Sequence, residues 1–106
     1  MRYEEMFDKV KAAAEGIDVS EITEHLAIQV DIIGEGAGIF YIEIKDGSLY
    51  IEPYDYVDHD AQFIVSAKDF IKIISGKLDP ITAFTLGRLK VKGNFQKALL
   101  LKKIKF

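Results

Sequence analysis

The pair Asp46-Gly47, set between two segments of alternating side chains, constrains the fold of this chain more than any other feature. In the preceding segment, residues 39–45, apolar side chains alternate with polar or tyrosine side chains, and a second extended segment, residues 48–54, follows at once. The tight turn between two twisted strands requires positive φ, which such a pair adopts readily. The sequence therefore predicts a β-hairpin. Pro53 has no amide hydrogen for a ladder hydrogen bond, so the second strand is expected at a sheet edge.

Other segments show the same alternation with a period of two: residues 26–32, 61–66 and 88–93. Each is predicted to be a strand with one buried face. A loop with three glycines, residues 34–38, joins the first of them to the hairpin. A Gly-rich loop can cradle a phosphate when it leads into a helix N-terminus. A strand follows here, so a hairpin turn is the favoured interpretation.

Helical spacing of apolar residues predicts a first helix over residues 3–17. The polar residues 18–24 are expected to add a further helical turn. Ser66, with Asp69 three residues later, resembles a capping box in which each side chain satisfies a backbone amide of the first turn. An apolar helix should follow and end at Gly76.

Two further helices are expected near the C-terminus. Asp79 and Pro80 match an N-cap followed by proline at the first helical position, and this short helix presents Ile81 and Phe84. Asn94 caps a last helix that is expected to run to the C-terminus. The order of helix, four strands, two helices, strand and helix predicts an α+β fold, with a sheet covered by helices on one face.

Length and composition set the broad class. A chain of 106 residues suits one domain with its own core, so residues 1–106 are expected to form a single domain. The absence of cysteine excludes disulfides, thiolate metal sites and thiol nucleophiles. The sequence shows no secretory signal, no membrane-spanning apolar stretch and no C-terminal Ser-Lys-Leu address. A cytoplasmic location is therefore expected.

Basic charge is concentrated at the C-terminal end. Residues 88–106 hold seven Lys or Arg residues and no acid, whereas residues 1–87 carry a net charge of −10. In a last α-helix, apolar side chains would lie on two nearly opposite sides, with Phe95, Leu99 and Phe106 on one and Leu100 and Ile104 on the other. Docking on a sheet buries one stripe, so the surplus is expected to meet another helix, a ligand, a partner or a membrane. A terminal helix wedged between other elements, with its lysines reaching solvent, is the alternative.

Candidate metal and catalytic residues are few. Asp55, Asp58, His59 and Asp60 could offer oxygen and imidazole ligands to a divalent cation, but their spacing matches no calcium loop. A solvated acidic loop without metal is expected. The two histidines, His25 and His59, lie in no recognisable catalytic context, and no serine lies in a nucleophile elbow. No catalytic residue is predicted.

A nucleic-acid site is also disfavoured. Arg88, Lys90, Lys92 and Lys97 form a basic patch beside Phe95. The strongly acidic remainder of the chain would repel a phosphate backbone, so no nucleic-acid partner is predicted.

Residues 76–94 resemble the sterol carrier protein 2-like (SCP2-like) lipid-binding domain family. That family shows Gly-x-Leu-x-Pro, then Ala before an aromatic residue, then Gly-x-Leu-x-Val-x-Gly followed by Asn or Asp, and a closing leucine-rich helix. The matching positions here are Gly76, Leu78, Pro80, Ala83, Phe84, Gly87, Leu89, Val91, Gly93 and Asn94. The hairpin and the acidic stretch before residue 61 are similar too, so the resemblance covers nearly the whole chain.

The resemblance implies a five-stranded, mostly antiparallel sheet with helices on one face, enclosing an apolar tunnel that the C-terminal helix closes. Family members carry fatty acids, acyl-CoA esters, phospholipids or sterols without catalysis, and no cofactor is expected. The lipid-contacting residues that it implies are Phe40, Ile42, Phe63, Val65, Phe70, Ile74, Ile81, Phe84, Phe95, Leu99, Leu100 and Ile104. Arg88, Lys97 and Lys102 are expected to contact an anionic head group or an anionic membrane surface.

The leading hypothesis is thus a non-catalytic intracellular carrier that takes one lipid into an apolar tunnel. The alternative is an interaction module in which the same surface forms a homodimer or docks on a partner enzyme. A third hypothesis makes the chain an accessory that presents acyl substrates to a separate enzyme.

Overall fold

The computed structural model describes residues 1–104. In chain order its elements are α1 (Tyr3–Ala14), β1 (Leu26–Ile33), β2 (Gly38–Lys45), β3 (Ser48–Glu52), β4 (Ala61–Ser66), α2 (Ala67–Ile74), α3 (Pro80–Thr85), β5 (Leu89–Gly93), α4 (Phe95–Ala98) and the 3-10 helix η1 (Leu99–Lys103). The predicted α+β class and the order of strands and helices are confirmed.

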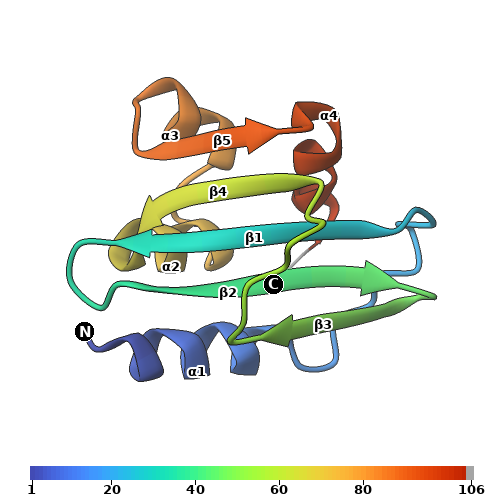
Figure 1. Ribbon diagram of the computed structural model, residues 1–106, viewed down its shortest axis with the longest axis horizontal. Coiled ribbons are helices and arrows are strands. Elements are labelled where there is room, and N and C mark those ends of the chain that lie inside the picture. Colours follow the sequence, from blue (N-terminus) through green and yellow to red (C-terminus); the bar gives the residue numbers. More distant parts are fainter. Residues whose placement is uncertain (105–106) are drawn as a thin grey trace.

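The five strands form one sheet in the order β3-β2-β1-β4-β5, with β1 at its centre (Figure 1). All neighbouring strands are antiparallel except β1 and β4, which run parallel. Val30 of β1 stands opposite Phe40 of β2 on one side and Phe63 of β4 on the other. The predicted hairpin joins β2 to β3, with Asp46 at φ 52° and Gly47 at φ 78°. As Pro53 indicated, β3 lies at the sheet edge.

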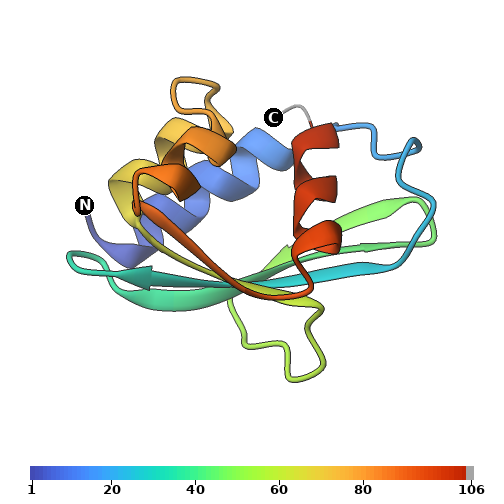
Figure 2. The ribbon, with the colours of Figure 1, turned by 90° about the horizontal axis from the view of Figure 1, so that it is seen from above.

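The helices cover one face of the sheet, and residues 53–60 lie on the other (Figure 2). On this outer face the Tyr56 hydroxyl donates a 2.7 Å hydrogen bond to Glu43, which also accepts one from His25 at 2.7 Å. The hydrogen bond to Glu43 raises the pKa of Tyr56 to about 12. Gln29 accepts a hydrogen bond from the Tyr56 amide at 3.1 Å. A hydrogen-bonded polar cluster thus lies on the outer face, whereas the buried core lies on the side of the helices.

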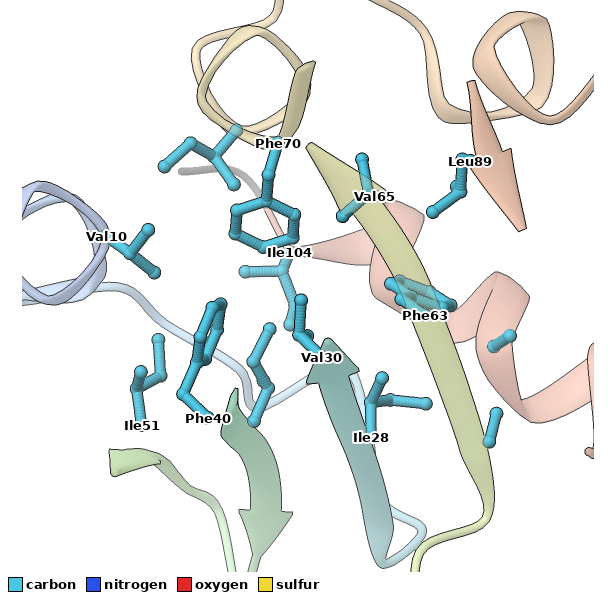
Figure 3. Packing of buried hydrophobic residues seen from close by; sticks show 14 of the residues in the cluster. Val10, Ile28, Val30, Phe40, Ile51, Phe63, Val65, Phe70, Leu89 and Ile104 are labelled. Atoms are coloured by element: carbon cyan, nitrogen blue, oxygen red, sulfur yellow. The ribbon is translucent and has the colours of Figure 1, made fainter. Parts of the chain in front are cut away.

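Alternation along the strands turns apolar side chains toward the helices, where they form the core. The largest fully buried side chains are Phe40, Met6, Leu26, Ile28, Ile42, Ile44, Val10, Val30 and Val65. Figure 3 shows Phe40 and Phe70 pointing into the space between sheet and helices. Four ring-to-ring neighbours, called here the aromatic row, run from α1 through β2 to α2: Tyr3, Phe7, Phe40 and Phe70, with successive centroids 5.9, 5.8 and 5.4 Å apart.

Gly38 has a steric role that its place in a glycine loop did not reveal. A Cβ at this position would overlap the ring of Tyr3. The Tyr3 hydroxyl, in turn, donates a 2.6 Å hydrogen bond to the carbonyl of Ile39. The start of β2 therefore needs a residue without a side chain so that α1 can pack against it.

Residues 18–24 do not add the expected helical turn. They form an irregular segment with one turn, in which the Ile22 amide donates to the Val19 carbonyl at 3.0 Å. Both Val19 and Ile22 are buried. The prediction was wrong because it treated the segment as polar, whereas two apolar side chains fix it to the core.

The last helix is not one continuous α-helix. A single α-turn, α4, is followed by η1, and Ile104 has an extended backbone. A 3-10 helix has three residues per turn, and four residues of this segment that stand three positions apart line one cavity: Phe95, Ala98, Leu101 and Ile104. The prediction of two opposite apolar sides was wrong because it assumed 3.6 residues per turn. The end of the predicted last helix, residues 105–106, lies outside the described residues.

Candidate functional site

An apolar cavity of about 250 Å³ lies between the sheet and the helices. Its lining comes from β2, β4, β5 and every helical segment after β4: Ile42, Phe63, Phe70, Ile73, Ile74, Asp79, Pro80, Ile81, Phe84, Leu89, Val91, Phe95, Ala98, Leu99, Leu101, Lys102 and Ile104. Only two of these side chains are charged. Such a lining suits an apolar ligand with a single polar end.

The floor of the cavity comes from the sheet. Ile42 of β2, Phe63 of β4, and Leu89 and Val91 of β5 all point to the helical side because alternate residues of a strand share one face. Phe63 stands directly opposite Val91 in the β4–β5 register. The pairing of β4 with the edge strand β5 therefore builds a continuous apolar floor.

The helix α2 forms one wall through Phe70, Ile73 and Ile74, which share a helical face. Its N-cap is half of the predicted capping box, since the Ser66 hydroxyl oxygen accepts from the Asp69 amide at 3.1 Å.

The other half of the box is replaced by an ion pair. The Asp69 carboxylate accepts hydrogen bonds from Arg88 at 2.5 and 3.2 Å. These hydrogen bonds hold the pKa of Asp69 below its ordinary value. The ion pair ties the start of α2 to the start of β5.

An apolar rim surrounds the mouth of the cavity. It consists of Ile81 and Phe84 from α3 together with Phe95 and Leu99 from the last segment, and their exposed fractions are 45%, 43%, 45% and 39%. The rings of Phe84 and Phe95 are 5.3 Å apart. Large apolar side chains that stay this exposed in a group mark a surface for binding.

The two charged lining residues, Asp79 and Lys102, are both exposed. Asp79 caps α3 by accepting from the Thr82 amide at 3.0 Å. That hydrogen bond, with a smaller contribution from Lys102, lowers the pKa of Asp79. Lys102 makes no ion pair with residues 1–104, so its ammonium group is available to a ligand at the mouth.

The lipid-contacting residues predicted from the sequence fall into two groups. Nine of them line the cavity: Ile42, Phe63, Phe70, Ile74, Ile81, Phe84, Phe95, Leu99 and Ile104. Phe40, Val65 and Leu100 are not among its lining residues. Phe40 is the neighbour of Phe70 in the aromatic row, and Val65 is fully buried.

The sequence interpretation missed seven lining residues: Ile73, Asp79, Pro80, Leu89, Val91, Ala98 and Leu101. Leu89 and Val91 could have been found, because the alternation of β5 already placed them on one face. Ala98 and Leu101 stand three positions apart, a spacing that puts residues on one helical face, so they too could have been found.

The three cations expected at a head group differ in their surroundings. Arg88 is paired with Asp69, as described. Lys97 donates to Asp60 at 3.2 Å and to the His25 carbonyl at 3.1 Å. Lys102 alone of the three lines the cavity.

The acidic segment before β4 has a structural role at Asp60. This carboxylate accepts from the Ala27 amide at 2.9 Å as well as from Lys97. His59 contacts the carbonyl of Tyr56 at 2.7 Å. Across residues 1–104, no three His, Asp or Glu side chains converge in a way that would hold a metal ion.

Within the same described residues, no helix is both long and apolar enough to cross a membrane.

Comparison with known proteins identifies the relatives of the chain. The family model described as the SCP-2 sterol transfer family matches residues 5–105. Hydroxysteroid dehydrogenase-like protein 2 from Bos taurus is 36% identical over 104 residues, which are 95% of this chain and 24% of that protein. Sterol carrier protein 2 from Arabidopsis thaliana is 30% identical over 84 residues, which are 74% of this chain and 68% of that protein.

A solved structure has the same fold. The solution structure of palmitated SCP2L2 from Aedes aegypti superposes with a TM-score of 0.70 at 17% identity, covering 97% of this chain and 93% of that one. The chain spans about a quarter of the length of the dehydrogenase-like relative.

Proposed function

The chain belongs to the SCP-2 sterol transfer family, and on that premise we propose that it is a non-catalytic intracellular lipid carrier. The observation that carries this proposal is the apolar cavity, whose lining has an exposed apolar rim and two charged side chains at its mouth. We propose that residues 1–106 act as one lipid-binding domain. The ligand class is a fatty acid, acyl-CoA, phospholipid or sterol-like molecule. The cytoplasmic location stays a prediction from the sequence.

Burial of an acyl chain in this cavity supplies the affinity. Each buried methylene contributes about 0.8 kcal/mol, so a chain segment of roughly eight methylenes would contribute about 6 kcal/mol before the cost of association. The floor and wall side chains Ile42, Phe63 and Phe70 are already buried in the protein, so they need no ordering when the ligand binds. A rigid, apolar cavity of this kind favours retention of a chain without any reaction.

The polar end of the ligand would lie at the mouth, close to Lys102. This cation lines the cavity and has no ion pair among the described residues. Arg88 is paired with Asp69 and Lys97 with Asp60. These two cations would therefore attract the anionic end of a ligand mainly through their charge and not by direct contact. An anionic carboxylate or phosphate thus fits this end best.

The same end of the molecule would meet a membrane when lipid is exchanged. The apolar rim offers exposed side chains, and residues 88–104 add six cations and no acid. Each Lys or Arg near an anionic bilayer contributes about 1 kcal/mol, and this attraction weakens with salt. Transient contact with an anionic membrane therefore belongs to the proposal.

A second candidate function is presentation of an acyl substrate to an enzyme, or docking on one as an interaction module. The observation that favours it is the relation to a dehydrogenase-like protein, of which the matched part forms only 24%. In that case the cavity would keep its ligand while a separate catalytic domain acts on it. Homodimerisation through the apolar rim is the other form of this alternative.

Uptake of a fluorescent fatty acid by the purified chain, with native mass spectrometry of the same preparation, tests the proposal. We expect one lipid per chain and saturable uptake. Leu99→Glu places a charge on the apolar rim and should weaken uptake about tenfold or more. Val57→Glu, a change at a side chain that is 83% exposed and absent from the cavity lining, should leave uptake unchanged.

Repeated absence of both co-purified lipid and uptake would refute the carrier proposal. A tight dimer in sedimentation that dissociates on Phe84→Glu, a change in the apolar rim, without any response to lipid, would favour the interaction module instead.

A further inference from the structure

Tyrosine side chains gather on the outer face of the sheet, opposite the cavity. Burial alternates along β3, so Tyr50 faces outward and has 44% of its surface exposed. The Tyr41 ring of β2 packs edge-on against Tyr56, with centroids 5.2 Å apart at 77°. Tyr54 lies in the loop of residues 53–60, which is on this face (Figure 2). Four of the five tyrosines of the chain therefore lie away from the cavity, whose lining includes none of them.

The loop that carries Tyr54 is fixed to the sheet. Its Tyr56 amide donates to the Gln29 side chain at 3.1 Å, and its Asp60 amide donates to the Ala27 carbonyl at 2.7 Å. Tyr54 itself is nevertheless 64% exposed. Side chains on a fixed backbone lose less freedom when a partner binds, and tyrosine is enriched at protein interfaces. The exposed rings thus suit a docking surface.

The surroundings of these rings are acidic. Residues 43–60 hold six acids and one lysine. Asp55 and Asp58 are exposed and make no ion pair with residues 1–104. Burial raises the pKa of the Tyr41 phenol, and the negative charge of Glu52 raises it further. A surface whose charge opposes the loss of a proton also attracts other cations.

An arginine side chain complements both the rings and the acids. Its guanidinium group stacks on aromatic faces and forms paired hydrogen bonds with carboxylates, whereas the ammonium group of lysine is a strongly hydrated point charge. An anionic membrane, by contrast, would be repelled from this face. The chemistry of the face therefore indicates a protein segment that presents arginine.

We propose that the outer patch, formed by Tyr50, Tyr54, Asp55 and Asp58, is a docking surface for an arginine-bearing segment of a partner protein. This inference goes beyond the carrier function and does not depend on it. The mouth of the cavity lies on the helical side of the sheet, at α3 and the last segment. A docked partner therefore leaves the mouth free to take up or release lipid.

The test uses a short fluorescein-labelled peptide in which arginine and glycine alternate, and a matched peptide with lysine in place of arginine. Anisotropy at low salt should show saturable binding of the arginine peptide, about twofold to threefold tighter than that of the lysine peptide. In a nitrogen-15 NMR titration, the amide signals of residues 50–58 should shift most. Absence of binding, or shifts spread over all acidic surfaces, would overturn the docking surface.

Substitution of one exposed ring separates stacking from charge. Tyr54→Leu should weaken binding of the arginine peptide about threefold to fivefold and remove the preference over lysine. Phe95→Leu removes an exposed ring on the helical side and should leave peptide binding unchanged. Equal binding by wild type and Tyr54→Leu would contradict the role of the ring.

The acids are tested with a charge-matched pair of variants. Asp55→Asn with Asp58→Asn should weaken peptide binding about fivefold at low salt. Asp8→Asn with Glu15→Gln makes the same total change at exposed positions on the helical side and should weaken binding less than twofold. An equal loss in both double variants would mean that net charge alone attracts the peptide, and would overturn the patch.

Uptake of a fluorescent fatty acid keeps this inference separate from the carrier function. Tyr54→Leu and the Asp55, Asp58 double variant should take up the lipid as the wild type does, because none of these residues lines the cavity. Intact uptake without peptide binding overturns the docking surface alone. Peptide binding without uptake overturns the carrier function alone.

A second copy of the chain is the other basic candidate for the patch, since residues 88–104 carry six cations and no acid. Sedimentation at low salt distinguishes it from a separate partner. The wild type should stay monomeric. Self-association that is lost in the Asp55, Asp58 double variant would assign the patch to the basic end of another copy and overturn the proposal of a separate partner.

Discussion

At the scale of single residues, Asp69 shows how one side chain connects two parts of the site. Its amide is capped by Ser66, and its carboxylate holds Arg88 at the start of β5. The capping-box motif predicted the first contact and not the second, because the cation is distant in sequence. Local spacing alone could not distinguish a carboxylate that caps its own helix from one that reaches across the fold.

The ion pair makes stability depend on pH. The Arg88 hydrogen bonds lower the pKa of Asp69 in the folded state. The ion pair therefore stabilises the fold fully at a pH above the pKa of Asp69 in the unfolded chain, and this stabilisation is lost as the pH falls through the pKa in the folded state. Asp69→Asn should therefore reduce the free energy of unfolding by about 1 kcal/mol at pH 7, a value limited by solvent screening at the partly exposed arginine. The difference between the variant and the wild type should shrink as the pH falls toward 2.

Urea unfolding at both pH values measures this difference. Asp58→Asn, which changes an exposed acid without an ion pair among residues 1–104, should show no pH-dependent loss. A loss in Asp69→Asn that is equal at pH 7 and pH 2 would contradict the role of the charge.

At the scale of elements, α4 is fastened to the strands by a small polar cluster. The Asn94 amide donates to the Asp60 carbonyl at 2.8 Å, and the Lys97 ammonium donates to the Asp60 carboxylate and to the His25 carbonyl. These contacts fix the start of the segment that carries Phe95 and Leu99 to the rim. The acidic loop before β4 thereby acts as a support for the cavity.

Removal of the ammonium group should loosen this segment. Lys97→Met keeps the apolar stem and should cost about 1 kcal/mol of stability. It should also speed dissociation of a bound fluorescent fatty acid, because η1 covers part of the cavity. Lys92→Met, on the exposed side of β5, is the control. Equal dissociation rates for both variants in stopped-flow measurements would exclude the fastening role.

Sequence patterns predicted the elements well where one face alone is buried. The period of two in β2, β4 and β5 placed every strand of the floor, and the Asp46-Gly47 turn fixed the hairpin register. The patterns failed at residues 18–24 and in η1, where long-range packing decides the backbone. Nine predicted site residues still reached the cavity, because most of them lie on elements that the patterns placed correctly.

At the scale of the whole molecule, charge and apolar surface coincide at one end. Lys102 and Lys103 are exposed in the segment that carries Leu99, whereas acids predominate in residues 1–87. Lys102→Glu with Lys103→Glu should slow lipid transfer to vesicles containing about a third phosphatidylserine by roughly tenfold at low salt. The effect should fade at high salt, where the charges are screened.

A charge-matched control separates docking from net charge. Lys9→Glu with Lys45→Glu makes the same total change at exposed positions of α1 and β2. Transfer that slows equally in both double variants would show that overall charge acts, and not the basic end.

The two edges of the sheet carry a final consequence. β3 has five residues and stops before Pro53, and β5 has five residues with Lys90 and Lys92 exposed. An edge strand that is short, charged or ended by proline offers few free backbone N–H and C=O groups for pairing with a strand of another copy. A protein that must keep an apolar cavity open to the solvent thus stays protected against fibril growth at the place where sheets ordinarily extend.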